Sequence, residues 1–543
     1  MKIKSIPLTA ILFISAVLLL NAEETPGEES YYPEAVPIEV PEEYQVFTEN
    51  DDTVYVIRDM EFNIDGRTRY WALITNGEFK EGEKIRGKGN FDKYLARKTQ
   101  LLLNQRVLEK ASIDYVLGES EEDGAVPVTL HVNVKDTFNL VILPYPKYDS
   151  NDGLSIILKM RDYNFLGTMS PLRVDLGYQH EDGDNIFSFS IDSDIPFRAI
   201  GLNWSLNFDH NFSYTVGEPL YYQNVTGLSV EFPLQPVAVT VGFNQYLMIN
   251  EENTDENINV YGLDDRYYGP YAGTELFASF KIPFGIEVGE FGELTYTPKV
   301  SGIINYPYGK MDEPRKPVAA LSHSLGFGLI SWIGNYRKGL SASMSNGFSW
   351  YFDRSDAPLR ITFEGEALFH WPFSKYFGIS TRLIFRQWWQ WSDSAGESIP
   401  YYKAGDVVRG VIDEDIRADY MLSLNLDLPI RIIRFWPSEW FNNPKLHFFD
   451  FEMHFSPFMD IAALKGPYSK LKADPNEGTN FSFNDLLYTC GIEIIVFPGF
   501  FRSFYLRGSI GYDIGRIRSE GLSKKWGFFP QWDEIFIGVD HYY

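Results

Sequence analysis

The feature that most constrains this chain is a two-residue alternation of apolar and polar side chains, repeated from about residue 137 to the C-terminus. In residues 422–428, for example, four leucines alternate with Ser423, Asn425 and Asp427. Alternation with this period places apolar side chains on one face of a β-strand and polar side chains on the other. Several segments approach the roughly 9 to 11 residues of a membrane-spanning strand, whereas strands of soluble sandwiches are usually about 5 or 6 residues long.

The connections between these segments favour a closed barrel. Short ones, such as residues 195–201 and 232–236, combine proline with aromatic residues, and they broadly alternate with longer polar ones, such as residues 250–269. After residue 22 the sequence holds no apolar run as long as a membrane-spanning helix, and 16% of its residues are aromatic. Only helices and closed barrels satisfy the backbone in lipid. We therefore predict a transmembrane antiparallel β-barrel of about 16 strands in residues 137–543.

The N-terminus predicts export. Lys2 and Lys4 precede an apolar run from Ile6 to Leu20, and Ala22 ends it, so residues 1–22 are interpreted as a signal peptide, with an uncleaved anchor as the alternative. Residues 23–52 contain eleven acidic residues and no lysine or arginine, which predicts a disordered acidic leader. The single cysteine, Cys490, excludes an internal disulfide.

Residues 53–136 are predicted to form a small α+β domain with the order strand, helix, helix, strand, strand. Thr68 is expected to cap the first helix, which ends at Gly77. Residues 128–134 alternate strictly and form the clearest strand of the domain.

Charge and motif composition argue against several functions. The formal net charge of −26 disfavours binding to nucleic acid or to an anionic headgroup surface. His447 and His454 lack zinc-site spacing, residues 86–93 lack the spacing of a phosphate-binding loop, and the acids of residues 252–257 are better explained as a solvated loop than as a calcium site. We identify no catalytic set, so we expect no enzymatic activity, no metal and no cofactor.

Three stretches, taken in order, resemble the BamA/TamA-type outer-membrane assembly and translocation superfamily. The α+β module resembles a POTRA domain. The start of the barrel resembles that of the family, through a turn motif with Tyr148, Ser150 and Gly153 and then a second motif of Asp162, Asn164, Phe165, Leu166 and Gly167. Residues 406–415, "DVVRGVIDED", resemble the sixth extracellular loop, in which Val408, Arg409 and Gly410 match the family motif. Val411 stands where the family has an aromatic residue, and five strand-like segments follow.

This resemblance implies that the loop folds back into the barrel and that Arg409 meets an acidic residue of the following strands. Asp460 or Asp427 is the implied partner, and Glu452 is a third acid that alternation directs into the lumen. The alternative is a solvated loop tip where Arg409 pairs with Asp413 or Asp415. The last strand, which would close the barrel, contains Ile535, Ile537, Gly538, Val539 and Tyr543.

The resemblance further implies a protein of the outer membrane, with the N-terminal domain in the periplasm. Its expected role is insertion, assembly or translocation of client proteins through a lateral seam, with outer-membrane lipid, clients and periplasmic or lipoprotein partners. Two departures from the family are the single POTRA-like module and the C-terminal tyrosine. The alternatives are a passive channel or structural barrel, and a soluble secreted sandwich.

Overall fold

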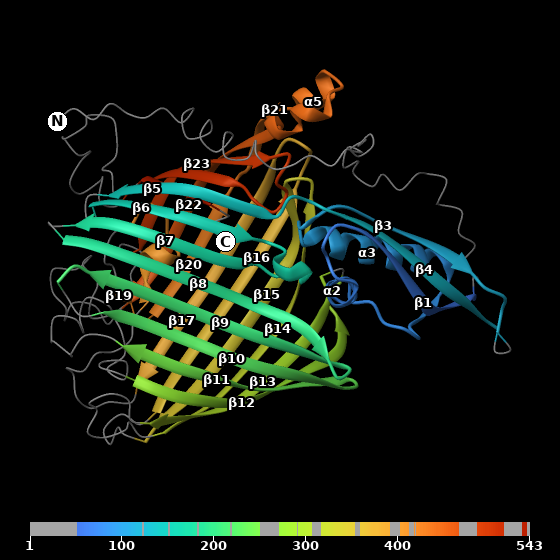
Figure 1. Cartoon of the computed structure of the whole chain (residues 1–543), viewed down its shortest axis with the longest axis horizontal. Helices are drawn as coiled ribbons and strands as arrows, with labels where there is room; N and C mark the ends of the chain where they lie inside the picture. Colours follow the sequence, from blue (N-terminus) through green and yellow to red (C-terminus); the bar gives the residue numbers. More distant parts are fainter. Residues whose placement is uncertain are drawn as a thin grey trace.

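The computed structural model describes residues 52–121, 124–149, 153–181, 184–217, 220–249, 271–289, 291–306, 317–352, 359–390, 402–411, 417–418, 420–465, 486–514 and 535–539. The predicted signal peptide, nearly all of the acidic leader, and Ser150, Asp413, Asp415 and Tyr543 lie outside these residues. The described chain forms a closed barrel and a small α+β domain that lies at one end of it (Figure 1).

The N-terminal domain is a four-stranded sheet packed against two helices. Its elements are β1 (Val54–Asp65), α2 (Tyr70–Asn76), β2 (Lys84–Arg86), α3 (Lys88–Asn104), β3 (Leu108–Leu117) and β4 (Ala125–Asp136). The sheet order is β2-β1-β4-β3, with β1 parallel to β4 at its centre. The alternating valines and leucine of residues 128–134 are buried in the core, where they meet residues of both helices. The short β2 between the helices was not predicted.

The predicted helix cap at Thr68 is wrong. The helix α2 begins at Tyr70, Arg69 holds the N-cap position, and no side chain caps it. Thr68 instead donates from Oγ1 to Asp136 at 2.6 Å. The Thr68 hydroxyl, which the local sequence assigns to the helix end, therefore binds Asp136, a carboxylate that is distant in the sequence.

The barrel consists of antiparallel neighbours closed between its last and first strands. Its strands are β5 (Leu140–Asp149), β6 (Gly153–Asp162), β7 (Leu172–Glu181), β8 (Asp184–Ala199), β9 (Leu202–Thr215), β10 (Tyr221–Leu234), β11 (Val237–Ile249), β12 (Tyr271–Glu287), β13 (Glu293–Tyr306), β14 (Val318–Ile333), β15 (Tyr336–Tyr351), β16 (Leu359–Pro372), β17 (Gly378–Gln390), β20 (Tyr420–Asp427), β21 (Ile430–Phe435), β22 (Phe451–Lys465), β23 (Leu487–Pro498), β24 (Leu506–Asp513) and β25 (Ile535–Val539). In the closed ring β25 lies beside β5.

These segments confirm the predicted antiparallel barrel preceded by an α+β domain. Both β20 and β21 pair with β22, so they are two halves of one strand, interrupted at Leu428 and Pro429. Counted in this way, the described residues give 18 strands, whereas the sequence predicted about 16. No described helix is both long enough and apolar enough to cross a membrane.

Alternation sorts the barrel side chains as the sequence predicts. Along β20, Ser423, Asn425 and Asp427 are buried, whereas Leu424 is exposed on the outside. Outward-facing apolar side chains recur around the wall and form an exposed belt; examples are Leu176, Val241, Leu276, Val300, Leu321, Leu383 and Ile492. A belt of this kind is what a bilayer requires of a barrel surface.

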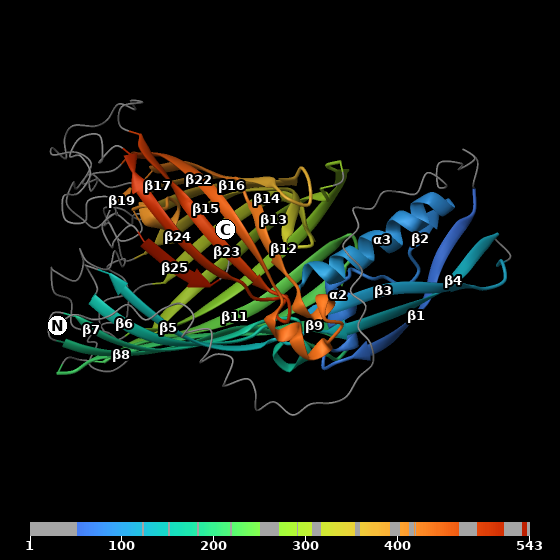
Figure 2. The same ribbon diagram turned by 90° about the horizontal axis from the view of Figure 1, so that it is seen from above.

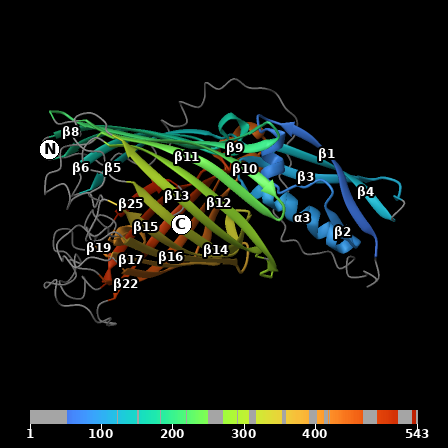
Figure 3. The same ribbon diagram turned by 90° about the horizontal axis from the view of Figure 1, so that it is seen from below.

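The connections at the end that bears the α+β domain are mostly tight. The β8–β9 and β10–β11 turns, for example, lie at residues 200–201 and 235–236. One connection at this end is long: between β21 and β22 the chain forms α5 (Pro437–Trp440) and η5 (Pro444–Phe449), which project beyond the barrel wall (Figure 1). The views from above and below show the α+β domain placed across the same end (Figure 2 and Figure 3).

Candidate functional site: an arginine held inside the barrel

The loop that follows β17 packs against the inner wall of the barrel. It contains β18 (Tyr402–Lys403), η4 (Ala404–Asp406) and β19 (Arg417–Ala418). The side chains of Val407, Val408 and Val411 are fully buried in a cluster that also includes Ile384 of β17 and Met421 of β20. Burial of three valines explains the apolar setting of the arginine, because a solvated loop would gain nothing from them.

Arg409 is the centre of this site. Its side chain is 1% exposed, and it forms hydrogen bonds with acids of two barrel strands. Asp460 of β22 accepts from the backbone N–H at 2.9 Å, from Nε at 3.0 Å and from Nη2 at 2.6 Å. Asp427, at the end of β20, accepts from Nη1 at 2.6 Å and from Nη2 at 3.3 Å. The guanidinium also lies 3.8 Å from the ring centre of Phe458.

Two bidentate pairs use four of the five N–H donors of this guanidinium, and the ring of Phe458 lies against it. Arginine suits such a position because its planar fork matches carboxylate geometry and stacks on aromatic rings. Charges buried in this way are stable only while each retains its partners, and removing one partner of a buried pair costs about 3–5 kcal/mol. The contact therefore fixes the loop to the wall and fixes the two strands relative to each other.

A third acid and a second arginine extend the network toward the seam. Glu493 of β23 lies 3.8 Å from Nη1 of Arg409, and it accepts from Nη1 of Arg507 on β24 at 3.1 Å. All four side chains that surround Arg409 in this network are buried; they are Asp427, Asp460, Glu493 and Arg507. The charges thus link one loop to four of the strands that follow it.

Gly410 is required by a close approach between the loop and β24. Its φ is +87°, a left-handed conformation that favours glycine, and a Cβ there would lie 3.0 Å from the backbone nitrogen of Tyr512. A Cβ on Gly511 would lie 2.7 Å from the Cα of Gly410. Asn425 adds a polar tether, since its Nδ2 donates to the carbonyl of Val407 at 2.7 Å. With glycine at both positions, the backbone of the loop can contact the backbone of β24 directly.

The structure brings together Val408, Arg409, Gly410, Asp427 and Asp460, as the inward interpretation of the loop predicts. It does not bring Glu452 to this site. Glu452 accepts instead from Arg431 at 3.4 Å and lies 2.6 Å from Nε2 of His454. It stands eight residues from Asp460 on the same strand, which corresponds to about 26 Å. Shared parity places both acids inside the barrel but cannot make them neighbours.

Five contributors were missed in the sequence: Asn425 as a tether, Phe458, Glu493, Arg507 and Gly511. A signal for two of them was present. Phe458 has the same parity as Asp460, and Glu493 alternates with the outward-facing Ile492 and Ile494. Val411, where the family has an aromatic residue, is buried within the valine cluster.

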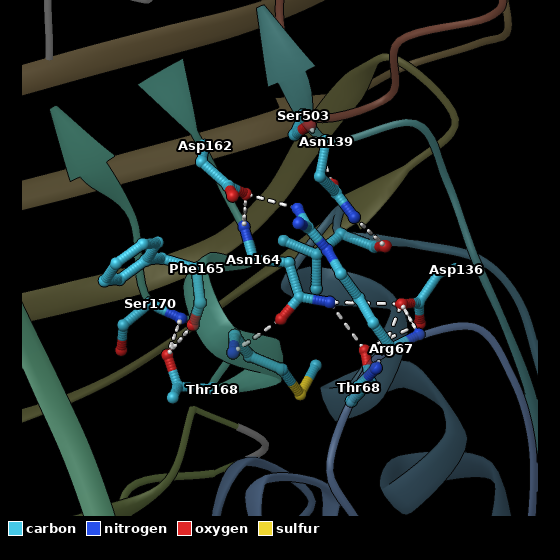
Figure 4. A network of polar contacts seen from close by, with 12 residues as sticks. Arg67, Thr68, Asp136, Asn139, Asp162, Asn164, Phe165, Thr168, Ser170 and Ser503 are labelled. Atoms are coloured by element: carbon cyan, nitrogen blue, oxygen red, sulfur yellow. Dashed lines mark hydrogen bonds and ion pairs between the residues drawn. The ribbon is translucent and has the colours of Figure 1, made fainter. Parts of the chain in front are cut away.

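The second predicted motif forms the joint between the barrel and the α+β domain (Figure 4). Asn164 is fully buried; its Nδ2 donates to Thr68 Oγ1 at 2.7 Å and to Asp136 at 3.2 Å, and its Oδ1 accepts from the backbone of Met169 at 2.8 Å. Asp162 accepts from the guanidinium of Arg67. The motif therefore binds the end of the domain's sheet to the first barrel hairpin.

Gly167 is part of the same joint. It ends the short helical turn η2 (Phe165–Gly167), has a φ of +75°, and a Cβ there would lie 2.0 Å from the carbonyl oxygen of Arg67. The carbonyl of Gly167 accepts from the backbone of Arg69 at 2.9 Å. Tyr148 and Gly153 lie at the far end of the same hairpin, where Asp149 pairs with Gly153, and their side-chain surroundings lie outside the description.

A second contact holds the domain across the barrel mouth. The guanidinium of Arg106 lies 4.2 Å from the ring centre of Trp332 and donates to the carbonyl of Arg502 and, at 3.3 Å, to Asn335. Burial, with Arg502 close by, lowers the pKa of Arg106 to about 9. The group therefore remains charged at neutral pH and keeps these donors.

The predicted closing strand is β25, which pairs with β24 from Val539 opposite Leu506 to Ile535 opposite Ile510. Gly538 lies opposite Arg507 in this register. The side chains of β25 lie outside the description, as does Tyr543.

Comparison with known proteins gives structural likeness only. No family model matches the chain, and no curated protein matches it. Among solved structures, BamA from Haemophilus ducreyi lacking POTRA domains 1–3 is 15% identical, with 85% of this chain and 81% of that chain covered at a TM-score of 0.33. CdiB from Escherichia coli is 12% identical (89% and 75% covered, TM-score 0.46), and CdiB from Acinetobacter baumannii is 13% identical (84% and 70% covered, TM-score 0.42).

At these identities the likeness concerns the fold, so function is inferred from the chain's own residues. The chain is an antiparallel β-barrel with an N-terminal α+β domain, structurally similar to BamA and to CdiB over about 85% of its length.

Proposed function

We propose that this protein inserts, assembles or translocates other proteins at the outer membrane through the seam between β25 and β5. The observation that carries the proposal is the position of the anchored loop beside the seam. The ring closes between β25 and β5, and β24, which the loop contacts, pairs with β25. Four strands before the seam are held to the loop through Arg409, Gly410 and Asn425.

The join between β25 and β5 links strands from the two ends of the barrel sequence, and no turn connects them. Without a connecting turn, strand pairing alone holds this edge, so we expect the seam to open more readily than a join within a hairpin. An open seam exposes backbone donors and acceptors that can pair with an incoming strand. The locked loop keeps the remaining wall in register while the seam exchanges partners. This activity needs no catalytic side chain, nucleotide or cofactor.

The N-terminal domain would face the periplasm and receive clients there. Its sheet ends in β3 on one side, an edge strand of ten residues with Val116 and Leu117 exposed. An extended client segment could add to such an edge by the same backbone pairing. The joint at Asn164 would hold that edge at a fixed angle to the barrel.

A passive channel is the competing function. It requires an open lumen, whereas here the buried loop occupies part of the lumen and the α+β domain lies across one mouth. Conductance in planar bilayers separates the two: we expect small, intermittent currents, and a large steady pore would favour the channel.

The seam is tested with reversible cross-links in a Cys490→Ser background, which removes the only native cysteine. Cysteines placed at Leu140 or Ile142 are paired with cysteines at Ile535 or Ile537. We expect oxidation to stop insertion of a reporter barrel into vesicles or outer membranes, and reduction to restore it. The matched control joins Leu321 to Phe348, which face each other across β14 and β15, and should leave insertion unchanged. Normal insertion with a fully cross-linked seam would overturn the proposal.

A further inference from the structure

The connection between β21 and β22 is unlike the other turns at its end of the barrel. It contains α5 and η5, and it projects away from the barrel wall (Figure 1). We call residues 432–449 the foot. The foot connects the strands that carry the two acidic partners of Arg409. Asp427 lies just before β21, and Asp460 lies on β22.

The foot is an ordered unit with its polar groups paired internally. Asp450 is 1% exposed and accepts from the backbone of Ser438 at 3.1 Å and from its hydroxyl, and it lies 2.8 Å from Nδ1 of His447. Asn443 caps η5 by accepting from the backbone of Lys445 at 3.1 Å. These bonds fix both short helices without help from the foot's outer face.

One side of the foot is anchored to the barrel. The rings of His447 and Phe448 lie 5.8 and 6.1 Å from the ring of Phe500, in the β23–β24 connection. Within the foot, Phe435 and Trp440 meet edge to face at 5.0 Å. The contacts with Phe500 therefore orient the foot against the barrel.

Several large apolar side chains of the foot are exposed. Phe441 is 70% exposed and Trp440 is 59% exposed, and Phe449 and Ile432 are also exposed. The neighbouring turn between β16 and β17 adds three more exposed aromatic residues, which are Phe373, Tyr376 and Phe377. Large exposed aromatic side chains on an ordered frame mark an interaction surface.

Cationic side chains accompany these rings. The guanidinium of Arg434 lies 4.7 Å from the ring centre of Trp436, and that of Arg431 lies 5.1 Å from the ring centre of Tyr376. Lys375 lies 5.4 Å from the same tyrosine ring. Arg434 is also paired with Glu439 at 3.0 Å and Arg431 with Glu452 at 3.4 Å, whereas Lys375 is exposed and can reach a lipid phosphate. Aromatic rings beside such a lysine are typical of a membrane interface.

The surface is continuous with the belt of the barrel. Outward-facing apolar residues run down the same strand into the foot, and they are Leu424, Leu428, Ile430, Ile432 and Ile433. From this continuity and the exposed aromatic side chains we propose that the foot lies in the periplasmic leaflet of the outer membrane and binds phospholipid. The net charge of −26 argues that apolar insertion, not attraction to anionic lipid, supplies the binding.

The inference rests on the barrel being in a membrane and does not depend on insertase activity. A foot embedded in lipid would hold strands β20 to β22 at a fixed depth in the membrane. The bilayer would then constrain the same strands whose acids bind Arg409.

The test uses nitroxide labels in the purified full-length protein, Cys490→Ser, reconstituted in phosphatidylcholine vesicles. The label is attached at Phe441→Cys, and two controls are Leu276→Cys on the exposed belt and Glu81→Cys on the exposed surface of the α+β domain. We expect the Phe441 label to match Leu276, with collision by oxygen several-fold favoured over a water-soluble nickel chelate. The Glu81 label should show the reverse.

Three outcomes would overturn the proposal. A Phe441 label as accessible to the nickel chelate as Glu81 would place the foot in water. A label shielded from both oxygen and nickel would mean that protein, such as a second copy, covers the foot. Access of the nickel chelate to the label at Leu276 would show that the exposed belt of the barrel does not lie in the membrane, and the foot would then not lie there either. Because Phe441 is exposed, its replacement should leave the fold intact, which unfolding on heating in detergent verifies.

Discussion

Two arcs of the same barrel satisfy their inward-facing polar groups in different ways. In the arc opposite the loop, the wall pairs with itself: Asn207 donates to Asn244 at 3.4 Å, Asn244 donates to Glu275 at 2.8 Å, and Lys299 lies 3.4 Å from Glu275. In the arc from β20 to β24, the acids Asp427 and Asp460 instead receive their cation from the loop. One arc is complete without the loop, whereas the other is complete only with it.

This difference explains where burial is deepest. Ser423, Asn425 and Asp460 in the arc under the loop are fully buried, whereas Asn207 and Asn244 in the opposite arc are half-buried. Charges under the loop are removed from water and depend on each other. In the opposite arc Glu275 is also buried, but its cation, Lys299, is 38% exposed, so that pair is partly screened. Matched substitutions in the two arcs should therefore differ in cost.

The largest difference is expected for the two cations. Arg409→Ala leaves buried carboxylates without their partner and should lower the free energy of unfolding by about 3–5 kcal/mol. Lys299→Ala, at a partly exposed pair in the other arc, should cost about 0–1 kcal/mol. Urea unfolding in detergent, followed by tryptophan fluorescence, measures both. Equal losses would remove the distinction between the arcs.

The two acids of Arg409 should differ in the same assay. Asp460 accepts three hydrogen bonds from Arg409 and Asp427 accepts two. Asp460→Asn should therefore cost more than Asp427→Asn, and for Asp460 the loss should be about 1.5–3 kcal/mol, as for hydrogen bonds to charged groups. A larger loss at Asp427 would mean that it, and not Asp460, is the main anchor.

The glycine contact gives a third, smaller effect. Gly410→Ala combines backbone strain with a collision at Tyr512, and it should cost about 1–3 kcal/mol. Gly201→Ala is the control, because Gly201 has a φ of +74° but nothing within 4 Å of its would-be Cβ. The excess cost at Gly410 over Gly201 measures the contact with β24, and no excess would mean that the loop can yield there.

Breaking the joint between the domain and the barrel should have the smallest effect on the stability of the barrel itself. Asn164→Ala removes the bridge between Thr68, Asp136 and the Met169 backbone. We expect the free energy that holds the domain against the barrel to fall by about 1–2 kcal/mol. The measurement is the distance distribution between spin labels on the domain and on the barrel, which should become broader. Barrel unfolding should change little. An unchanged distribution would show that the Arg106 contact alone holds the domain.

The period of the strands could be read from the sequence because alternation is a local property. It directs Asp427, Glu452 and Asp460 into the barrel, and all three are buried. Position along a strand and register between a loop and a wall are long-range properties. Hence alternation does not show that Glu452 lies far from Arg409, and the approach of Gly410 to Gly511 was not foreseen.

Other features were missed because the local pattern pointed elsewhere. Thr68 precedes a helix and has the chemistry of a cap, yet Asp136 competes for its hydroxyl across the domain. The foot was missed because proline and aromatic residues usually marked tight turns at that end of the barrel. Its fold depends on Asp450, a buried acceptor whose partners cannot be recognised from spacing alone.

The anchoring of the loop by Arg409 and Asp460 is tested most directly by a double-mutant cycle of Arg409→Ala and Asp460→Ala in the unfolding assay. If the two side chains act as one buried unit, the double variant should lose little more than Arg409→Ala, and the coupling energy should reach about 1–3 kcal/mol. A parallel cycle of Lys299→Ala with Asp460→Ala should be additive. Additive losses for Arg409 and Asp460 would contradict the account, because the loop would then be held by something other than this pair.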